Sequence, residues 1–130
     1  MADTFRFELV TPERMALSED VAQVVVPGVE GEFTVLPGHA PVISALRPGV
    51  IEVALPDAGK RRIFVKGGFA EIDAGHLTVL AERALPVEEM DAALVAVELE
   101  AAQAELAAAG DDASRLAAAS AVEQLRTLRP

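Results

Sequence analysis

The composition of the chain changes abruptly near Pro86, and this break divides the 130 residues into two parts. Before Pro86, short apolar runs are separated by turn residues at intervals of roughly 8–12 residues, which is typical of sandwiches and flattened barrels. After Pro86 the chain is rich in alanine, its only glycine is Gly110, and no proline follows until Pro130. The sequence therefore predicts an α+β chain, with an N-terminal antiparallel β-sandwich over 1–86 and a C-terminal antiparallel α-helical hairpin over 87–130.

Alternation of apolar and polar side chains predicts the individual strands. Phe5, Phe7 and Leu9 share one face of the first strand, because successive side chains in a strand point to opposite sides. Further strands are expected over 15–17, 21–26, 32–36, 42–46, 50–55, 63–66, 69–72 and 76–82. The glycine pair Gly67–Gly68 interrupts one of them and indicates either a bulge or a close backbone approach.

The hairpin is expected to consist of two helices separated at Gly110, with Asp111 or Asp112 capping the second. Apolar spacing assigns one packing face to each helix. These faces are Met90, Leu94, Val97, Ala101 and Ala104 on the first helix, and Leu116, Ala119, Val122, Leu125 and Arg126 on the second. Since an alanine buries little apolar area, we expect the sandwich to hold the hairpin weakly.

The segment Gly28–Pro41 is rich in residues that shape the backbone. Glycine supplies conformational freedom, and Pro37 and Pro41 restrict φ on either side of His39. A stiff loop that presents a histidine favours a partner contact; the alternative is that the ring caps backbone carbonyls. Glu30 and Glu32 are either part of the same surface or a solvated pair beside a turn.

Composition excludes several classes of function. A formal net charge of −10 and a pI near 4.5 disfavour binding to nucleic acid or to anionic lipid. The chain has no cysteine and two histidines, without the spacing of a metal motif, so no metal site is expected. No nucleophile elbow or phosphate loop is present, and we expect no enzyme activity. The N-terminal residues do not resemble a signal peptide, and no apolar run approaches the length of a membrane span.

Four segments together resemble one known family. They read GEFTVLPGHAP over 31–41, LRPG over 46–49, GGFAE over 67–71 and TVLAE over 78–82. Their order, followed by an alanine-rich two-helix tail, is similar to the epsilon chain of F-type ATP synthase over the whole length. The segment FELVTPE over 7–13 also resembles the first strand of that family.

The resemblance implies a non-catalytic rotor subunit of the central stalk, which couples proton-driven rotation of the c-ring to ATP synthesis. Its sandwich would bind the gamma subunit on one side and the polar loops of the c-ring at its base. Glu32 and His39 match family positions in the loops that meet the c-ring, and Pro37, Gly38 and Pro41 would form their scaffold. The implied location is peripheral, on the cytoplasmic face of the bacterial plasma (inner) membrane, without direct lipid insertion.

The hairpin resembles an element that folds against the sandwich or extends along gamma toward the alpha and beta subunits, where it restrains ATP hydrolysis. Some members of the family bind ATP at a motif of the form I/L-D-x-x-R-A near the start of the first helix. Asp91 is retained here, but Leu94 stands where the motif has arginine, so no bound ATP or other cofactor is expected. If inhibition requires basic residues, the few on the second helix (Arg115, Arg126 and Arg129, against Glu123) predict weak inhibition.

Two other functions stay open from the residues alone. A free-standing ligand-binding β-sandwich, capped by the helices, would be a stable monomer with an internal pocket. A hydrolase that uses His39 would lose its activity in a His39→Ala variant.

Overall fold

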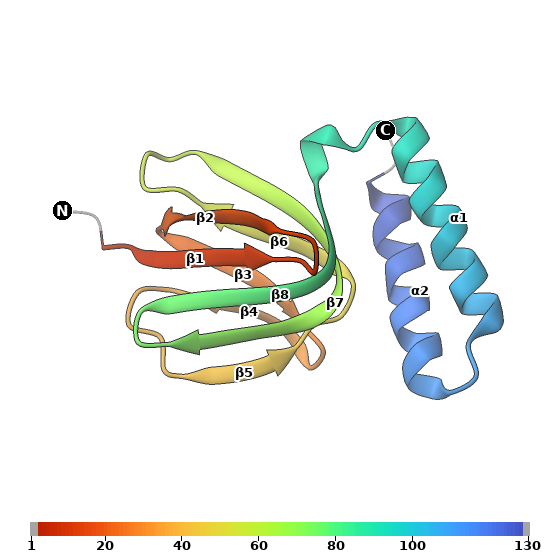
Figure 1. Ribbon diagram of the computed structural model, residues 1–130, viewed down its shortest axis with the longest axis horizontal. Helices are drawn as coiled ribbons and strands as arrows, with labels where there is room; N and C mark the ends of the chain where they lie inside the picture. Colours follow the sequence, from red (N-terminus) through yellow and green to blue (C-terminus); the bar gives the residue numbers. More distant parts are fainter. Residues whose placement is uncertain (1–2, 129–130) are drawn as a thin grey trace.

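The computed structural model describes residues 3–128 and confirms the predicted fold class, a β-sandwich followed by two helices (Figure 1). The strands are β1 (Phe5–Val10), β2 (Met15–Val21), β3 (Gln23–Gly28), β4 (Gly31–Val35), β5 (Val42–Ala45), β6 (Gly49–Ala54), β7 (Lys60–Asp73) and β8 (His76–Pro86). A 3₁₀ turn, η1 (Val87–Glu89), leads to α1 (Ala92–Ala108) and α2 (Asp112–Thr127).

The strands are hydrogen-bonded in the order β2-β1-β8-β7-β6-β3-β4, with β5 paired to β7. All pairs are antiparallel except β1 with β8, so the predicted antiparallel sandwich is confirmed with one parallel pair that the strand pattern does not reveal. Parallel strands need a long connection, and here six strands separate β1 from β8. The apolar run 21–26, which was expected to form one strand, is divided between two. Val21 is the last residue of β2 and pairs with Phe5, whereas Val24 belongs to β3.

The sheet folds over on itself where β7 passes through Gly67–Gly68. Before this point β7 pairs with β6, and after it β7 pairs with β5. The set of residues that points into the core also shifts by one position at the bend. Val65 and Ala70 are both buried, although they are five positions apart and regular alternation would put them on opposite faces of the strand. Both glycines have positive φ, +72° and +114°. The register with β8 continues without an inserted residue, so the close backbone approach is confirmed and the bulge is not.

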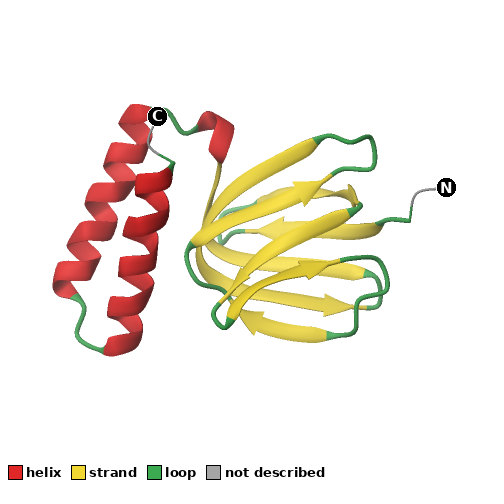
Figure 2. Cartoon of the chain, turned by 180° about the vertical axis from the view of Figure 1, so that it is seen from behind, coloured by secondary structure: helices red, strands yellow, loops and turns green. Residues whose placement is uncertain are grey.

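Two hydrophobic clusters result from this arrangement. The first lies between the layers of the sandwich and contains most of the inward residues of the strands, including Phe7, Ile51 and Leu77. The second joins the hairpin to the sandwich and contains Phe64 with buried residues of both helices. Seen from behind in Figure 2, both helices lie beyond one end of the sandwich.

The helices bury the predicted faces only in part: Met90, just before α1, is buried and Leu94 is half-buried as expected. On α1 the buried residues are Val95, Glu98, Leu99 and Ala102, whereas Val97, Ala101 and Ala104 are exposed. On α2, Val122 and Leu125 are buried as expected, but Leu116, Ala119 and Arg126 are exposed. Because α1 carries apolar residues on all sides, apolar spacing does not select a face; its contacts with the sandwich do.

Both helices begin at an aspartate cap. The Asp111 carboxylate accepts a hydrogen bond from the Ser114 backbone N–H at 2.7 Å, which confirms one of the two predicted caps. That hydrogen bond lowers the pKa of Asp111. Asp91 caps α1 in the same way, accepting from the Leu94 N–H at 2.8 Å.

Candidate partner-binding site

The loop between β4 and β5 is closed by a turn. The His39 N–H donates to the Leu36 carbonyl at 3.1 Å, and Gly38 has a φ of +85°. The His39 Nδ1 lies 2.7 Å from the Ala40 carbonyl oxygen, and since a carbonyl only accepts, Nδ1 carries the proton in this contact. The ring is exposed, with its centroid 6.5 Å from that of Phe33. The histidine therefore both bonds a carbonyl and stays accessible to a partner.

The predicted site residues do not all lie in this loop. Pro37, Gly38, His39 and Pro41 belong to it, and all but the half-buried Pro37 are exposed. Glu32 is exposed on β4, where it pairs with Pro27 beside the turn between β3 and β4. That turn is at the opposite end of β4 from the His39 loop, so Glu32 and the loop are separated by the length of the strand.

A row of apolar residues crosses four strands and reaches this loop through β5, and we call it the apolar strip; Ile43, Phe69 and Leu80 in it are exposed, and Val10 and Ala45 are half-buried. It consists of Val10 of β1, Ile43 and Ala45 of β5, Phe69 of β7 and Leu80 of β8. Direct register partners connect it: Ala45 with Phe69, Phe69 with Leu80, and Leu80 with Val10. Ile43, Phe69 and Leu80 are 68%, 55% and 53% exposed. A contiguous apolar surface of this kind marks an interaction site.

The order of residues along the chain does not by itself single out the apolar strip. Phe69 and Glu71 occupy outward positions on β7, on either side of the buried Ala70. A large aromatic residue at a position where alternation expects a polar one is the signal that could have identified the site. Its neighbours on β5 and β8 come from distant parts of the chain, and only the pairing of the strands brings them together.

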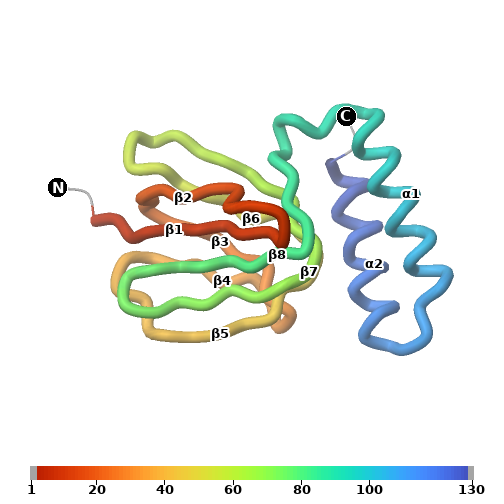
Figure 3. Tube along the Cα trace, in the orientation of Figure 1, coloured from red at the N-terminus to blue at the C-terminus, as the bar shows by residue number. Residues whose placement is uncertain are grey.

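The apolar strip and the His39 loop are continuous through β5, which begins at Val42 directly after Pro41. The tube in Figure 3 places the connection between β4 and β5 at the end of the sandwich away from the helices. Ile43, Phe69 and Leu80 of the apolar strip are each more than half exposed, so the docked hairpin leaves the strip uncovered.

The hairpin covers a second surface, which we call the docking face. It is formed by the first half of β7 and the last part of β8. Its apolar part is a row of direct register partners, Val50, Phe64 and Leu85, packed in the cluster with the helices. Beside that row, Lys66 and Arg83 are also register partners. Ser120 of α2 donates a hydrogen bond to the Pro48 carbonyl at 3.1 Å.

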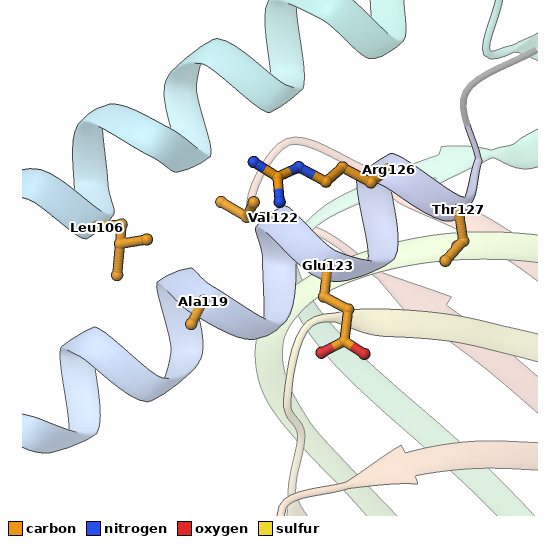
Figure 4. Close-up of a pocket in the computed structure, with 6 residues that line it drawn as sticks. All are labelled: Leu106, Ala119, Val122, Glu123, Arg126 and Thr127. Carbon is orange, nitrogen blue, oxygen red and sulfur yellow. The ribbon is translucent and has the colours of Figure 1, made fainter.

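The candidate regulatory residues of the hairpin are dispersed. Arg126 lines a shallow groove of α1 and α2 together with Leu106, Ala119, Val122, Glu123 and Thr127 (Figure 4). Arg115 pairs with Asp112 at 3.2 Å, and Asp91 is the cap of α1. Asp91 and Leu94 do not line the groove, and Arg129 lies outside the described residues.

Neither helix within residues 3–128 combines the length and the apolar character needed to cross a membrane. In the same range, no three histidine, aspartate or glutamate side chains come together as a metal site would require.

Comparison with known proteins gives a consistent result. Residues 4–87 match the family model of the ATP synthase delta/epsilon chain β-sandwich domain. The chain is 45% identical over 129 residues to the ATP synthase epsilon chain of Parvibaculum lavamentivorans, covering 99% of this chain and 98% of that one. It is also 45% identical to the ATP synthase epsilon chain of Mesorhizobium japonicum, with 98% and 95% covered.

Solved structures show the same likeness. A chain in the cryo-EM structure of Euglena gracilis mitochondrial ATP synthase (OSCP/F1/c-ring) superposes with a TM-score of 0.74 at 31% identity, covering 96% of this chain and 79% of that chain. A chain from the central stalk and c-ring of Tetrahymena thermophila mitochondrial ATP synthase has the same fold, with a TM-score of 0.64 at 16% identity. From the match over the sandwich and the identity over nearly the whole chain, we conclude that this chain belongs to the ATP synthase delta/epsilon family, as a non-catalytic epsilon chain.

Proposed function

We propose that this chain is a rotor subunit that joins the gamma subunit to the c-ring and so couples proton-driven rotation to ATP synthesis. The observation that carries the proposal is the exposed apolar strip beside the His39 loop, which the chain's own hairpin leaves free. The apolar strip would bind gamma. The His39 loop and Glu32 would contact the polar loops of the c-ring, which would place the protein at the cytoplasmic face of the inner membrane without insertion into lipid.

Replacing Phe69 with alanine is expected to weaken binding to gamma. Aromatic residues at the centre of an interface typically contribute about 2 kcal/mol or more, which is roughly 30-fold in affinity. Since Phe69 is exposed, the free energy of unfolding of the free chain should change little. Titration of immobilised gamma with the purified chain measures the effect.

Val97→Ala is the matched control for Phe69→Ala. Val97 is a similarly exposed apolar residue, 60% accessible, but it lies on α1 away from the apolar strip. It should bind gamma like the unaltered chain. Equal affinities for the Phe69→Ala chain and the unaltered chain would contradict the assignment of gamma to the apolar strip.

We further propose that the hairpin is a movable arm, docked in this structure, that extends toward the alpha and beta subunits and restrains ATP hydrolysis. Within the described residues, α2 carries two arginines, Arg115 and Arg126, against Asp112 and Glu123. If the extended arm must meet acidic surfaces, this balance makes its inhibition weak. ATP is not expected to regulate the arm, because the Asp91 carboxylate is engaged as a helix cap and Leu94 replaces the motif arginine.

Deleting residues 87–130 is expected to leave assembly with gamma intact, since the apolar strip belongs entirely to the sandwich. ATP hydrolysis by the assembled complex should rise or stay unchanged. The deletion uncovers Phe64 and its neighbours, so the free truncated chain should be less soluble than the full chain. Co-purification with gamma and the hydrolysis rate of the complex measure the first two outcomes. Loss of gamma binding would show that the two parts do not divide these roles.

A further inference from the structure

Glu98 is the one buried charged residue in the part of the chain that the structure describes. Its two carboxylate oxygens accept hydrogen bonds from the Arg83 side chain, from Nε at 2.7 Å and from Nη2 at 3.1 Å. Arg83 lies on β8 and Glu98 on α1, so this two-point contact joins the sandwich to the hairpin. A bidentate pair of this type fixes geometry as well as contributing energy.

A second ion pair lies beside the first. Lys66 Nζ is 2.5 Å from Glu105 Oε1, again between the sandwich and α1. The two cations are direct register partners on β7 and β8, an arrangement of like charges that is unfavourable by itself. The two glutamates are seven residues apart, which is about two helical turns and therefore the same face of α1. In the docked position the carboxylates of Glu98 and Glu105 therefore lie beside the adjacent cations Arg83 and Lys66.

The apolar contacts alone do not specify this docked position. Phe64 and its neighbours supply non-directional burial, and α1 has a second apolar face in Val97, Ala101 and Ala104 that stays exposed. If α1 turned that face to the sandwich, Glu98 and Glu105 would move off the cations. The charge pairs therefore discriminate against docking through this second apolar face, a role that buried ion pairs can serve even when they add little net stability.

We propose that Arg83, Glu98, Lys66 and Glu105 form an electrostatic latch that selects the docked position of the hairpin and sets how often it opens. This inference deepens the proposed function, because it rests on the hairpin being the movable arm. The side chains of Arg83 and Glu105 are about half exposed, and salt screens exposed charges. The open population of the full-length chain therefore rises with ionic strength.

The latch is tested on the full-length free chain, which has no native cysteine. Cysteines placed at the exposed positions Lys60 on the sandwich and Gln103 on α1 carry two spin labels, and double electron–electron resonance gives the distribution of distances. We expect Arg83→Glu and Glu98→Arg each to raise the population outside the docked distance by about tenfold or more, since each leaves a buried charge unpaired or opposed. The charge-swapped double variant Arg83→Glu/Glu98→Arg should return most molecules to the docked distance.

The control is Asp112→Arg, which breaks an exposed arginine–carboxylate pair that is confined to α2 and does not touch the sandwich. It should leave the distance distribution unchanged. Glu98→Gln keeps the shape of the side chain and removes only its charge, so the arm should open less often in this variant than in Glu98→Arg. Its response to salt should be smaller than that of the unaltered chain, because only the Lys66–Glu105 pair remains to be screened. Circular dichroism confirms that each variant retains its helices.

Two results would overturn the latch: charge-reversed chains as fully docked as the unaltered chain, or a double variant as open as the single variants. Gamma is absent from this experiment. A failure of the rotor assignment would instead appear as loss of the gamma binding that Phe69 is predicted to support, so the two failures are distinguishable.

Discussion

Replacing Phe64 with alanine is expected to release the hairpin from the sandwich, at a cost of about 3–5 kcal/mol in the free energy that holds the docked state. Phe64 is fully buried, although it lies on the outer face of β7. Its ring is covered by the second hydrophobic cluster, between Val50 and Leu85 on the sheet and the buried residues of the helices. Removing the ring leaves a cavity at the centre of that contact.

Hydrogen exchange measures the effect of Phe64→Ala on each part of the chain separately. The amides of α1 and α2 should lose protection strongly, whereas those of β1 and β3 should keep theirs, because the core between the layers does not include Phe64. The comparison variant is Phe69→Ala on the same strand, whose exposed ring should leave exchange in the helices unchanged. If Phe64→Ala preserved protection throughout the hairpin, Phe64 would not be the anchor of the docked state.

Gly68→Ala is expected to have an effect of similar or larger size on the sandwich itself, above about 4 kcal/mol or sufficient to prevent folding. A Cβ at this position would lie 1.8 Å from the Leu80 carbonyl oxygen and 2.8 Å from its carbon. The contact is with backbone, so no side-chain rotation relieves it. The φ of +114° adds strain for any residue with a side chain. Chemical denaturation followed by circular dichroism measures the loss.

Gly75→Ala separates the two causes. Gly75 also has a positive φ, +81°, but a Cβ there meets nothing within 4 Å. The free energy of unfolding of this variant should therefore fall only by the cost of placing a side chain at positive φ, about 1 kcal/mol. Similar losses for the two variants would mean that the close approach at Leu80 contributes little and that the bend tolerates a methyl group.

Most of the strands were predictable because they carry their own signals. In β1, Phe5, Phe7 and Leu9 alternate with polar residues and are all buried, and the Pro56–Gly59 turn closes through the Asp57 side chain, which accepts from the Gly59 N–H at 3.0 Å. The end of the sandwich near Pro86 follows from a change of composition that needs no tertiary information. Local rules of this kind act within a few residues.

The faces of the helices were not predictable from the same rules. Val97 and Leu99 are both apolar and only two positions apart on α1, yet the first is exposed and the second buried. The choice between them depends on Phe64 and Arg83, which precede α1 in the sequence and belong to another part of the fold. The buried Glu98 illustrates the same point, because a glutamate on a helix is expected to face solvent unless a partner is present.

The sequence by itself determined the class of the fold, the order of its elements, the start of the second helix at Asp111 or Asp112 and, through four short motifs in order, the family. Only the tertiary structure decided the parallel pairing of β1 with β8, the assembly of the apolar strip from four strands, and the face on which α1 docks. The physical reason is the range of the interactions. Propensity, alternation and capping act between neighbours in the chain, whereas a surface or a docking face is made by residues that only folding brings together.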